Sequence, residues 1–155
     1  QRLHTRRYVV KRGQGIPPFS VEKNARVLQF ADPKFRNDKE FLLEAIRNNA
    51  WVLHKDNIVD ASQREDREFL LAAVKKNAVS IKYIDPKFRN DKEFLLEAIR
   101  NNAWVLHKDN IVDASQREAC DDREFLLAAV KKNAVSIKYI DPKFRNDKEF
   151  LLEAI

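Results

Sequence analysis

The sequence is poor in glycine, proline and cysteine and has no long hydrophobic run. Two glycines and five prolines among 155 residues disfavour a turn-rich all-β protein and favour helices. The single Cys120 cannot form an internal disulfide, and one thiol does not make a metal site. No apolar run approaches the roughly 20 residues that span a bilayer, so we expect no transmembrane segment.

The remaining composition is that of a folded chain. Hydrophobic residues make up 44% of the sequence and include ten phenylalanines, which argues against intrinsic disorder even with 35% charged residues. The lack of a possible disulfide fits a reducing, intracellular setting, although no feature indicates a particular compartment.

The positive charge is confined to the beginning of the chain. The net charge is +6, and residues 1–30 hold seven Lys and Arg against one acid, so residues 31–155 are neutral in sum. Five of these bases precede Gly13 and Pro17, which suggests a basic N-terminal arm over residues 1–18. The candidate contacts of this arm with a polyanion or an acidic partner are Arg2, Arg6, Arg7, Lys11 and Arg12. The alternative is a capping segment whose charges are solvated.

The rest of the sequence repeats itself. Residues 32–65 are identical to 85–118, and residues 66–99 are identical to 122–155; the second copy carries the insertion Ala119-Cys120-Asp121. A shorter phrase, Asp-[Lys/Arg]-Glu-Phe-Leu-Leu-x-Ala-[Ile/Val], recurs at intervals of 25–31 residues and starts at Asp38, Asp66, Asp91, Asp122 and Asp147. Repetition at this period is typical of solenoids.

Each phrase predicts a helix of about 11 residues. Asn37 and Asp38 offer N-cap oxygens at its start, and Asn49 suits its end because Asn tolerates the left-handed conformation. The apolar residues of the phrase wrap more than half of the helix, as expected where a helix packs between two neighbours. After it, Ala78, Ile81 and Ile84 predict a short second helix that Pro86 ends; a strand is the competing interpretation.

These patterns predict an all-α protein: a tandem helical-repeat array (α-solenoid) of roughly 25–31-residue two-helix units. The array is expected over residues 19–155, with units near 19–37, 38–65, 66–90, 91–121 and 122–146 and a truncated unit at 147–155. Because the spacer before Asp122 absorbs three extra residues, we expect it to be a surface loop with an exposed Cys120.

The phrase Asp-[Lys/Arg]-Glu-Phe-Leu-Leu-x-Ala-[Ile/Val]-x-x-Asn resembles a family of short helical repeats catalogued only as a domain of unknown function. The resemblance covers about residues 20–155 and implies tandem arrays of paired helices without an assigned enzymatic activity. The family commonly places Gly after the Asn. This chain has Ala at that place, as Ala50, Ala78, Ala103 and Ala134.

Few residues suggest chemistry. His54 and His107 lie near aspartates, but two such residues are not a coordination set, so no metal or other cofactor is expected. Glu40 and Glu44 stand one helical turn apart, which favours a solvated charge ladder with Arg47 over acid–base catalysis. Catalytic motifs and small-molecule sites are not evident.

Trp51 and Trp104 occupy equivalent places, shortly after the end of a predicted helix. They either pack in the core between units or form an aromatic ladder that contacts a ligand.

The repeat array and the lack of catalytic motifs together predict a non-enzymatic protein-binding or scaffold module, part of a larger protein or assembly. The alternative is a nucleic-acid-binding solenoid that uses the basic arm, with weak affinity.

Overall fold

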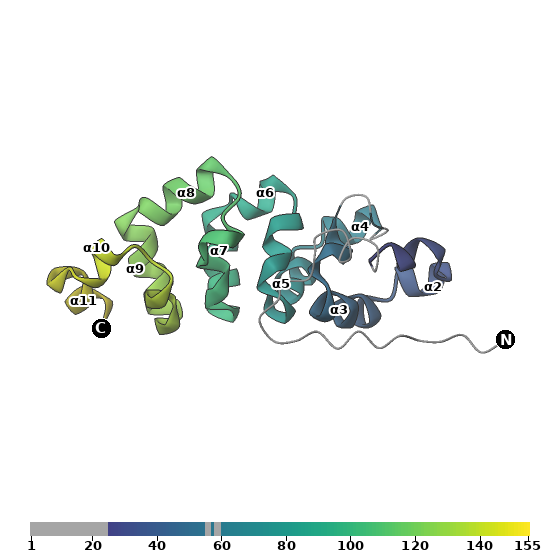
Figure 1. Cartoon of the computed structure of the whole chain (residues 1–155), viewed down its shortest axis with the longest axis horizontal. Helices are drawn as coiled ribbons and strands as arrows, with labels where there is room; N and C mark the ends of the chain where they lie inside the picture. The colour runs from purple at the N-terminus through teal and green to yellow at the C-terminus, as the bar shows by residue number, and fades with distance from the viewer. Residues whose placement is uncertain (1–24, 55–56, 58–59) are drawn as a thin grey trace, which may run out of the picture.

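The computed structural model describes residues 25–54, 57 and 60–155. Within these residues the protein is built from helices without a strand, and the elements follow one another as an extended array (Figure 1). The all-α repeat prediction is confirmed. The proposed arm at residues 1–18 and the first residues of the unit at 19–37 lie outside the described residues.

Three kinds of element alternate along the chain. The principal helices are α3 (Lys39–Asn48), α5 (Arg67–Lys76), α7 (Lys92–Asn101), α9 (Arg123–Lys132) and α11 (Lys148–Ala154). The 3-10 helices are η1 (Arg26–Phe30), η2 (Ala50–Leu53), η3 (Ala78–Tyr83), η4 (Ala103–Leu106), η5 (Lys108–Asn110) and η6 (Ala134–Lys138). The short α-helices are α2 (Pro33–Arg36), α4 (Ala61–Arg64), α6 (Pro86–Arg89), α8 (Ala114–Asp121) and α10 (Pro142–Arg145). The two-helix prediction is therefore incomplete, because each full unit adds a short α-helix to the expected pair.

Each principal helix begins at the aspartate of the repeated phrase. The carboxylate of Asp38 accepts a hydrogen bond from the main-chain N–H of Phe41 over 3.1 Å, and Asp66 does the same for Phe69. These bonds satisfy an N–H that has no partner within the first helical turn. The acid that follows, such as Glu40 in α3, also lies at the positive end of the helix dipole.

The principal helices end differently from the prediction. Asn49 has φ −153° and ψ 102°, which is extended backbone rather than the left-handed conformation. Its Oδ1 accepts a hydrogen bond from Trp51 N over 3.0 Å, so the side chain starts the following 3-10 helix instead of closing a left-handed turn. Extended backbone does not require Gly afterwards, which explains why this chain accommodates Ala50.

The principal helices pack side by side in chain order, and the 3-10 helices form a second row beside them. α3, α5, α7, α9 and α11 each contact the next in this series, as do η2, η3, η4 and η6. The core runs continuously between the two rows, and its fully buried residues include Leu42, Leu70, Phe94, Leu126 and Phe150. A helix in the middle of the array is thus covered on both sides, as its wide apolar surface predicts.

Two further predictions, the role of Pro86 and the loop at the insertion, are corrected. Pro86 does not merely end the second helix: it is the first residue of α6, where Asp85 accepts from Lys87 N over 2.9 Å and proline suits the first helical position. The inserted Ala119-Cys120-Asp121 lengthen α8 to eight residues and are not a loop. Ala119 is buried and Cys120 half-buried, so the expectation of an exposed Cys120 is wrong.

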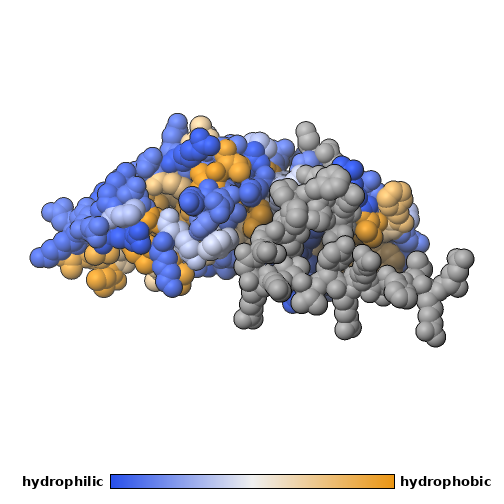
Figure 2. Space-filling model, in the orientation of Figure 1, coloured by the Kyte–Doolittle hydropathy of each residue, from blue (hydrophilic) through white to orange (hydrophobic). Residues whose placement is uncertain are grey.

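The surface in Figure 2 is mostly hydrophilic, with separate hydrophobic areas. One of them lies at the end of the array where α11 is found, and α11 contributes Leu151 and Leu152, 36% and 63% exposed. Among the described residues, none of the helices has the length and apolar character that crossing a membrane requires.

Candidate functional site

Two clusters of aromatic side chains repeat along the row of 3-10 helices. In the first aromatic cluster, the rings of Trp51 and His54 stack with centroids 4.0 Å apart and planes 7° apart. Tyr83, from the next unit, meets Trp51 edge-on at 5.1 Å. The second aromatic cluster consists of Trp104, His107 and Tyr139, and the ring centroid of Trp104 lies 4.0 Å from that of His107 and 5.3 Å from that of Tyr139.

The local sequence explains the stack. The side chain of Asn102 accepts from Trp104 N over 3.1 Å and starts η4 at Ala103. A 3-10 helix has three residues per turn, so side chains three residues apart eclipse one another, and this brings His107 over Trp104. Asn110 then donates through Nδ2 to the carbonyl of Trp104 over 2.8 Å, which holds the main chain behind the stack.

The clusters are neither core nor fully exposed. The Trp104 residue is 40% exposed, and the His107 side chain is 24% exposed. Trp51 is partly buried and packs against the core. Rings that combine a buried side with a solvent-facing side are typical of protein interfaces. The structure therefore brings Trp51 and Trp104 into equivalent, partly exposed clusters, each completed by a histidine and a tyrosine.

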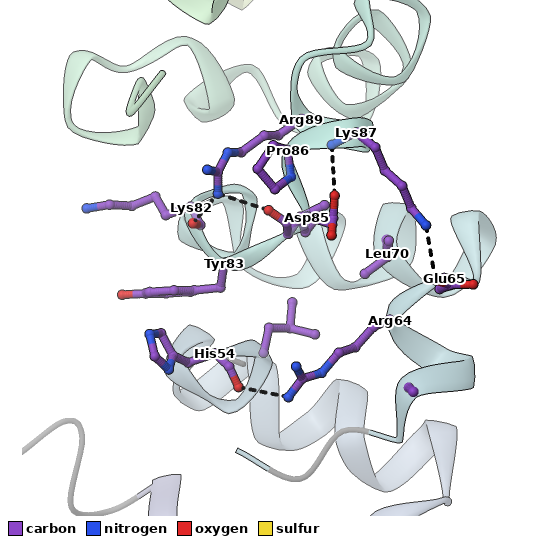
Figure 3. Close-up of a pocket in the computed structure, with 13 residues that line it drawn as sticks. His54, Arg64, Glu65, Leu70, Lys82, Tyr83, Asp85, Pro86, Lys87 and Arg89 are labelled. Carbon is purple, nitrogen blue, oxygen red and sulfur yellow. Dashed lines mark hydrogen bonds and ion pairs between the residues drawn. The ribbon is translucent and has the colours of Figure 1, made fainter. Parts of the chain in front are cut away.

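A cleft lies beside each cluster. The first cleft has a volume of about 490 Å³ and is lined by residues that include Leu53, His54, Arg64, Tyr83 and Asp85. In Figure 3, His54, Tyr83 and Lys82 extend toward the same side of this cleft. The second cleft, of about 570 Å³, has the equivalent residues Leu106, Arg117, Tyr139 and Asp141 in its wall. Both clefts and both clusters lie where a unit starting Asp-Lys-Glu-Phe meets one starting Asp-Arg-Glu-Phe.

Exposed ion pairs lie at the rims of the clefts. Lys87 Nζ lies 3.2 Å from Glu65 Oε1 at the first cleft (Figure 3), and Lys143 Nζ lies 3.4 Å from Asp121 Oδ1 at the second. Asp121 belongs to the insertion. The inserted residues thus supply a carboxylate in the position that Glu65 occupies in the first copy.

Arg89 links the first cleft to the unit that follows. Its guanidinium donates to the carbonyls of Lys82 and Ile84, both over 2.9 Å, and its Nε lies 2.5 Å from Asp113 Oδ2. The hydrogen bond from Arg89 lowers the pKa of Asp113. An arginine held by two carbonyls and a carboxylate acts as a structural tie.

The residues considered for chemistry form separate pairs and do not gather into one site. His107 Nδ1 lies 3.4 Å from Asp109 Oδ2, and within the part of the chain that the structure describes, no group of three or more His, Cys, Asp or Glu side chains could hold a metal ion. Glu44 pairs with Arg47 over 2.9 Å in the charge ladder that the sequence predicts. Arg2, Arg6, Arg7, Lys11 and Arg12 lie outside the described residues.

Comparison with known families agrees with the repeated geometry. The family model described as "Domain of unknown function (DUF4116)" matches residues 19–55, 66–108 and 122–155. These segments cover more than half of the chain, so the protein belongs to this family. No curated protein and no solved structure matches the chain.

Proposed function

We propose that this array is a non-enzymatic scaffold module that binds protein partners within a larger assembly, and that the row of 3-10 helices is its binding face. The observation that carries the proposal is the pair of partly exposed clusters, Trp51–His54–Tyr83 and Trp104–His107–Tyr139, each beside a cleft. Aromatic side chains beside small clefts are the usual anchors of protein recognition.

The repetition itself supports a macromolecular partner. The clusters are built from identical segments at equivalent junctions, so they present the same chemistry twice along one extended surface. Two equal sites on one rigid array gain affinity for a partner that reaches both, because the second contact becomes intramolecular.

The proposal is tested by selecting peptides from a random display library on the immobilised full chain. We expect the library to yield enriched peptides. Their affinity should be at least about tenfold lower for the Trp51→Ala/Trp104→Ala variant, since truncating an interface tryptophan commonly costs about 2 kcal/mol or more of binding free energy. Val79→Ala/Val135→Ala is the matched control. These valines hold the place of tryptophan in the other units, and Val135 is 48% exposed.

Because Trp51 packs partly against the core, Trp104→Ala alone is measured as well, with the helical circular dichroism of each variant as a check of folding. Failure to enrich any peptide, or equal affinity of wild type and folded tryptophan variants, overturns the proposal. A single-stranded RNA that binds the chain while no peptide is enriched would favour the nucleic-acid alternative.

A further inference from the structure

The neutral sum of residues 31–155 conceals a segregation of charge along the principal helices. Every principal helix starts with two acids, an aspartate cap and a glutamate, as in Asp66 and Glu68 of α5. Bases occupy the last turns, as in Lys75 and Lys76 of α5 and Lys131 and Lys132 of α9. Each arrangement complements the dipole of its own helix.

Contacts between neighbouring principal helices show that their first turns lie side by side and that their last turns do so too. At the starting ends, Lys39 Nζ of α3 lies 2.6 Å from Asp66 Oδ2 at the cap of α5. At the finishing ends, Asn77 after α5 donates to the carbonyl of Ile46 in α3 over 3.1 Å. Figure 1 shows α5, α7 and α9 side by side, with α6 and α8 toward the same end of the row. The bases of the last turns therefore line one edge of the array.

This basic edge consists of Arg47, Lys75, Lys76, Arg100, Lys131 and Lys132, all exposed. Two of its members are already neutralised, because Arg47 pairs with Glu44 over 2.9 Å and Arg100 with Glu97 over 2.6 Å. The four lysines form no ion pair with any other residue that the structure describes. The edge thus presents two lysine pairs separated by a neutral helix end.

Resting on the proposed function, we propose that the basic edge binds an extended acidic peptide segment of the protein partner, with one acidic group for each lysine pair. The lysine pairs end α5 and α9, with α7 between them. Packed helices lie 8–10 Å apart, so the pairs are about 16–20 Å apart. An extended chain advances about 3.3 Å per residue, which places the two acidic groups about five to six residues apart.

The spacing favours a peptide over a nucleic acid. A single strand carries a phosphate at every nucleotide, so several phosphates would face Glu97 and the carbonyl ends of α7 between the lysine pairs. A peptide can place acidic residues only where lysines meet them. The edge also adjoins the aromatic clusters, since Trp104 N is hydrogen-bonded to Asn102 at the end of α7, so one partner segment can contact both features.

The test uses synthetic, fluorescently labelled peptides on a neutral scaffold and the full chain, measured by anisotropy at low salt. One probe has two Asp-Glu pairs whose centres are about six residues apart, and a second has the same composition with the pairs adjacent. We expect the spaced probe to bind at least about fivefold more tightly than the adjacent one, because only it reaches both lysine pairs.

The decisive variant is Lys75→Gln/Lys76→Gln/Lys131→Gln/Lys132→Gln, which we expect to weaken binding of the spaced probe by at least about tenfold. The matched control, Lys34→Gln/Arg67→Gln/Arg145→Gln/Lys148→Gln, removes the same number of charges from α2, α10 and the starts of α5 and α11, away from both clefts. It is expected to change the affinity by less than about twofold.

Equal losses in the two variants, equal affinity for the spaced and adjacent probes, or tighter edge-dependent binding of a single-stranded RNA would each overturn the inference. Peptides from the library that depend on the tryptophans but carry no acidic residues would overturn it too, while leaving the proposed function in place.

Discussion

The side-chain amide of Asn77 donates a hydrogen bond to the carbonyl of Ile46, in the preceding principal helix, over 3.1 Å. The Oδ1 atom of the same Asn77 accepts from Val79 N over 3.2 Å. Asn133 forms the equivalent bond to the carbonyl of Ile99 over 3.0 Å. One side chain therefore starts the 3-10 helix of its own unit and satisfies a carbonyl at the helix end of its neighbour, which fixes how the two units stack.

Replacing Asn77 by Ala should lower the free energy of unfolding by about 1–3 kcal/mol, because a helix-terminal carbonyl and a main-chain N–H both lose their partner. Asn48→Ala is the control, since among the described residues the exposed Asn48 amide bonds only to the carbonyl of Glu44 in its own helix, and should cost no more than about 0.5 kcal/mol. Urea unfolding measures both. Equal costs would mean that Asn77 does not join the units.

Leu95 and Leu151 occupy the same position in identical helix sequences, yet Leu95 is 5% exposed and Leu151 is 36% exposed. Leu95→Ala should cost about 2–5 kcal/mol of unfolding free energy through lost burial and a cavity. Leu151→Ala should cost less than half as much, because α11 has a principal helix on one side only among the described residues. If both substitutions are equally destabilising, the two helices are equally covered.

Acid should weaken the stacking of units. Hydrogen bonds from Lys39 and Lys92 lower the pKa of Asp66 and Asp122 below 3.8. A carboxyl whose pKa is lower in the folded state stabilises the fold above its unfolded pKa, and this stabilisation is lost as the pH falls through the folded value. Asp66→Asn/Asp122→Asn keeps capping groups but should flatten the decline of the urea midpoint below about pH 4.

The matching variant Lys39→Gln/Lys92→Gln should flatten the same decline, since the hydrogen bonds from these lysines are the largest cause of the lowered pKa. If the urea midpoint of both variants declines at acid pH as steeply as that of the wild type, these pairs do not set the pH dependence.

Cys120 should react slowly in the native protein. Burial, with a smaller effect of the neighbouring Asp121 carboxylate, raises the pKa of Cys120 from 9.0 to about 11, so little thiolate, the reactive form, exists at neutral pH. Alkylation by iodoacetamide should be at least about tenfold slower in buffer than in urea. Similar rates in both conditions would indicate an exposed thiol and a loop at residues 119–121.

Local sequence signals predicted the principal helices, because the Asp cap, the following Glu and the wide apolar surface all act within one helix. The short α-helices are not predicted in this way. Pro86 ends the preceding pattern and so indicates a stop, although Asp85-Pro86 is itself a helix-start pattern. The difference in length at the insertion predicts a loop, because the sequence does not distinguish an added loop from an added helical turn. In the structure, the turn buries Ala119.

The site was only partly predictable. Trp51 and Trp104 stand out by repetition, and the three-residue spacing from Trp51 to His54 was an available signal for stacking. Tyr83 was not predictable as their partner, because it arrives from the next unit through tertiary packing. The basic edge is not predictable from the net charge of residues 31–155, which is zero. A net charge does not tell which ends of the helices lie together.

Small-angle X-ray scattering of the monomeric chain tests the stacked array most directly. A globule of 155 residues has a radius of gyration of about 15 Å. A row of principal helices in which each contacts the next should exceed this value and give a pair-distance distribution with an early maximum and a long tail. A radius of gyration near 15 Å with a symmetric distribution would contradict the stacked array and, with it, the extended binding face.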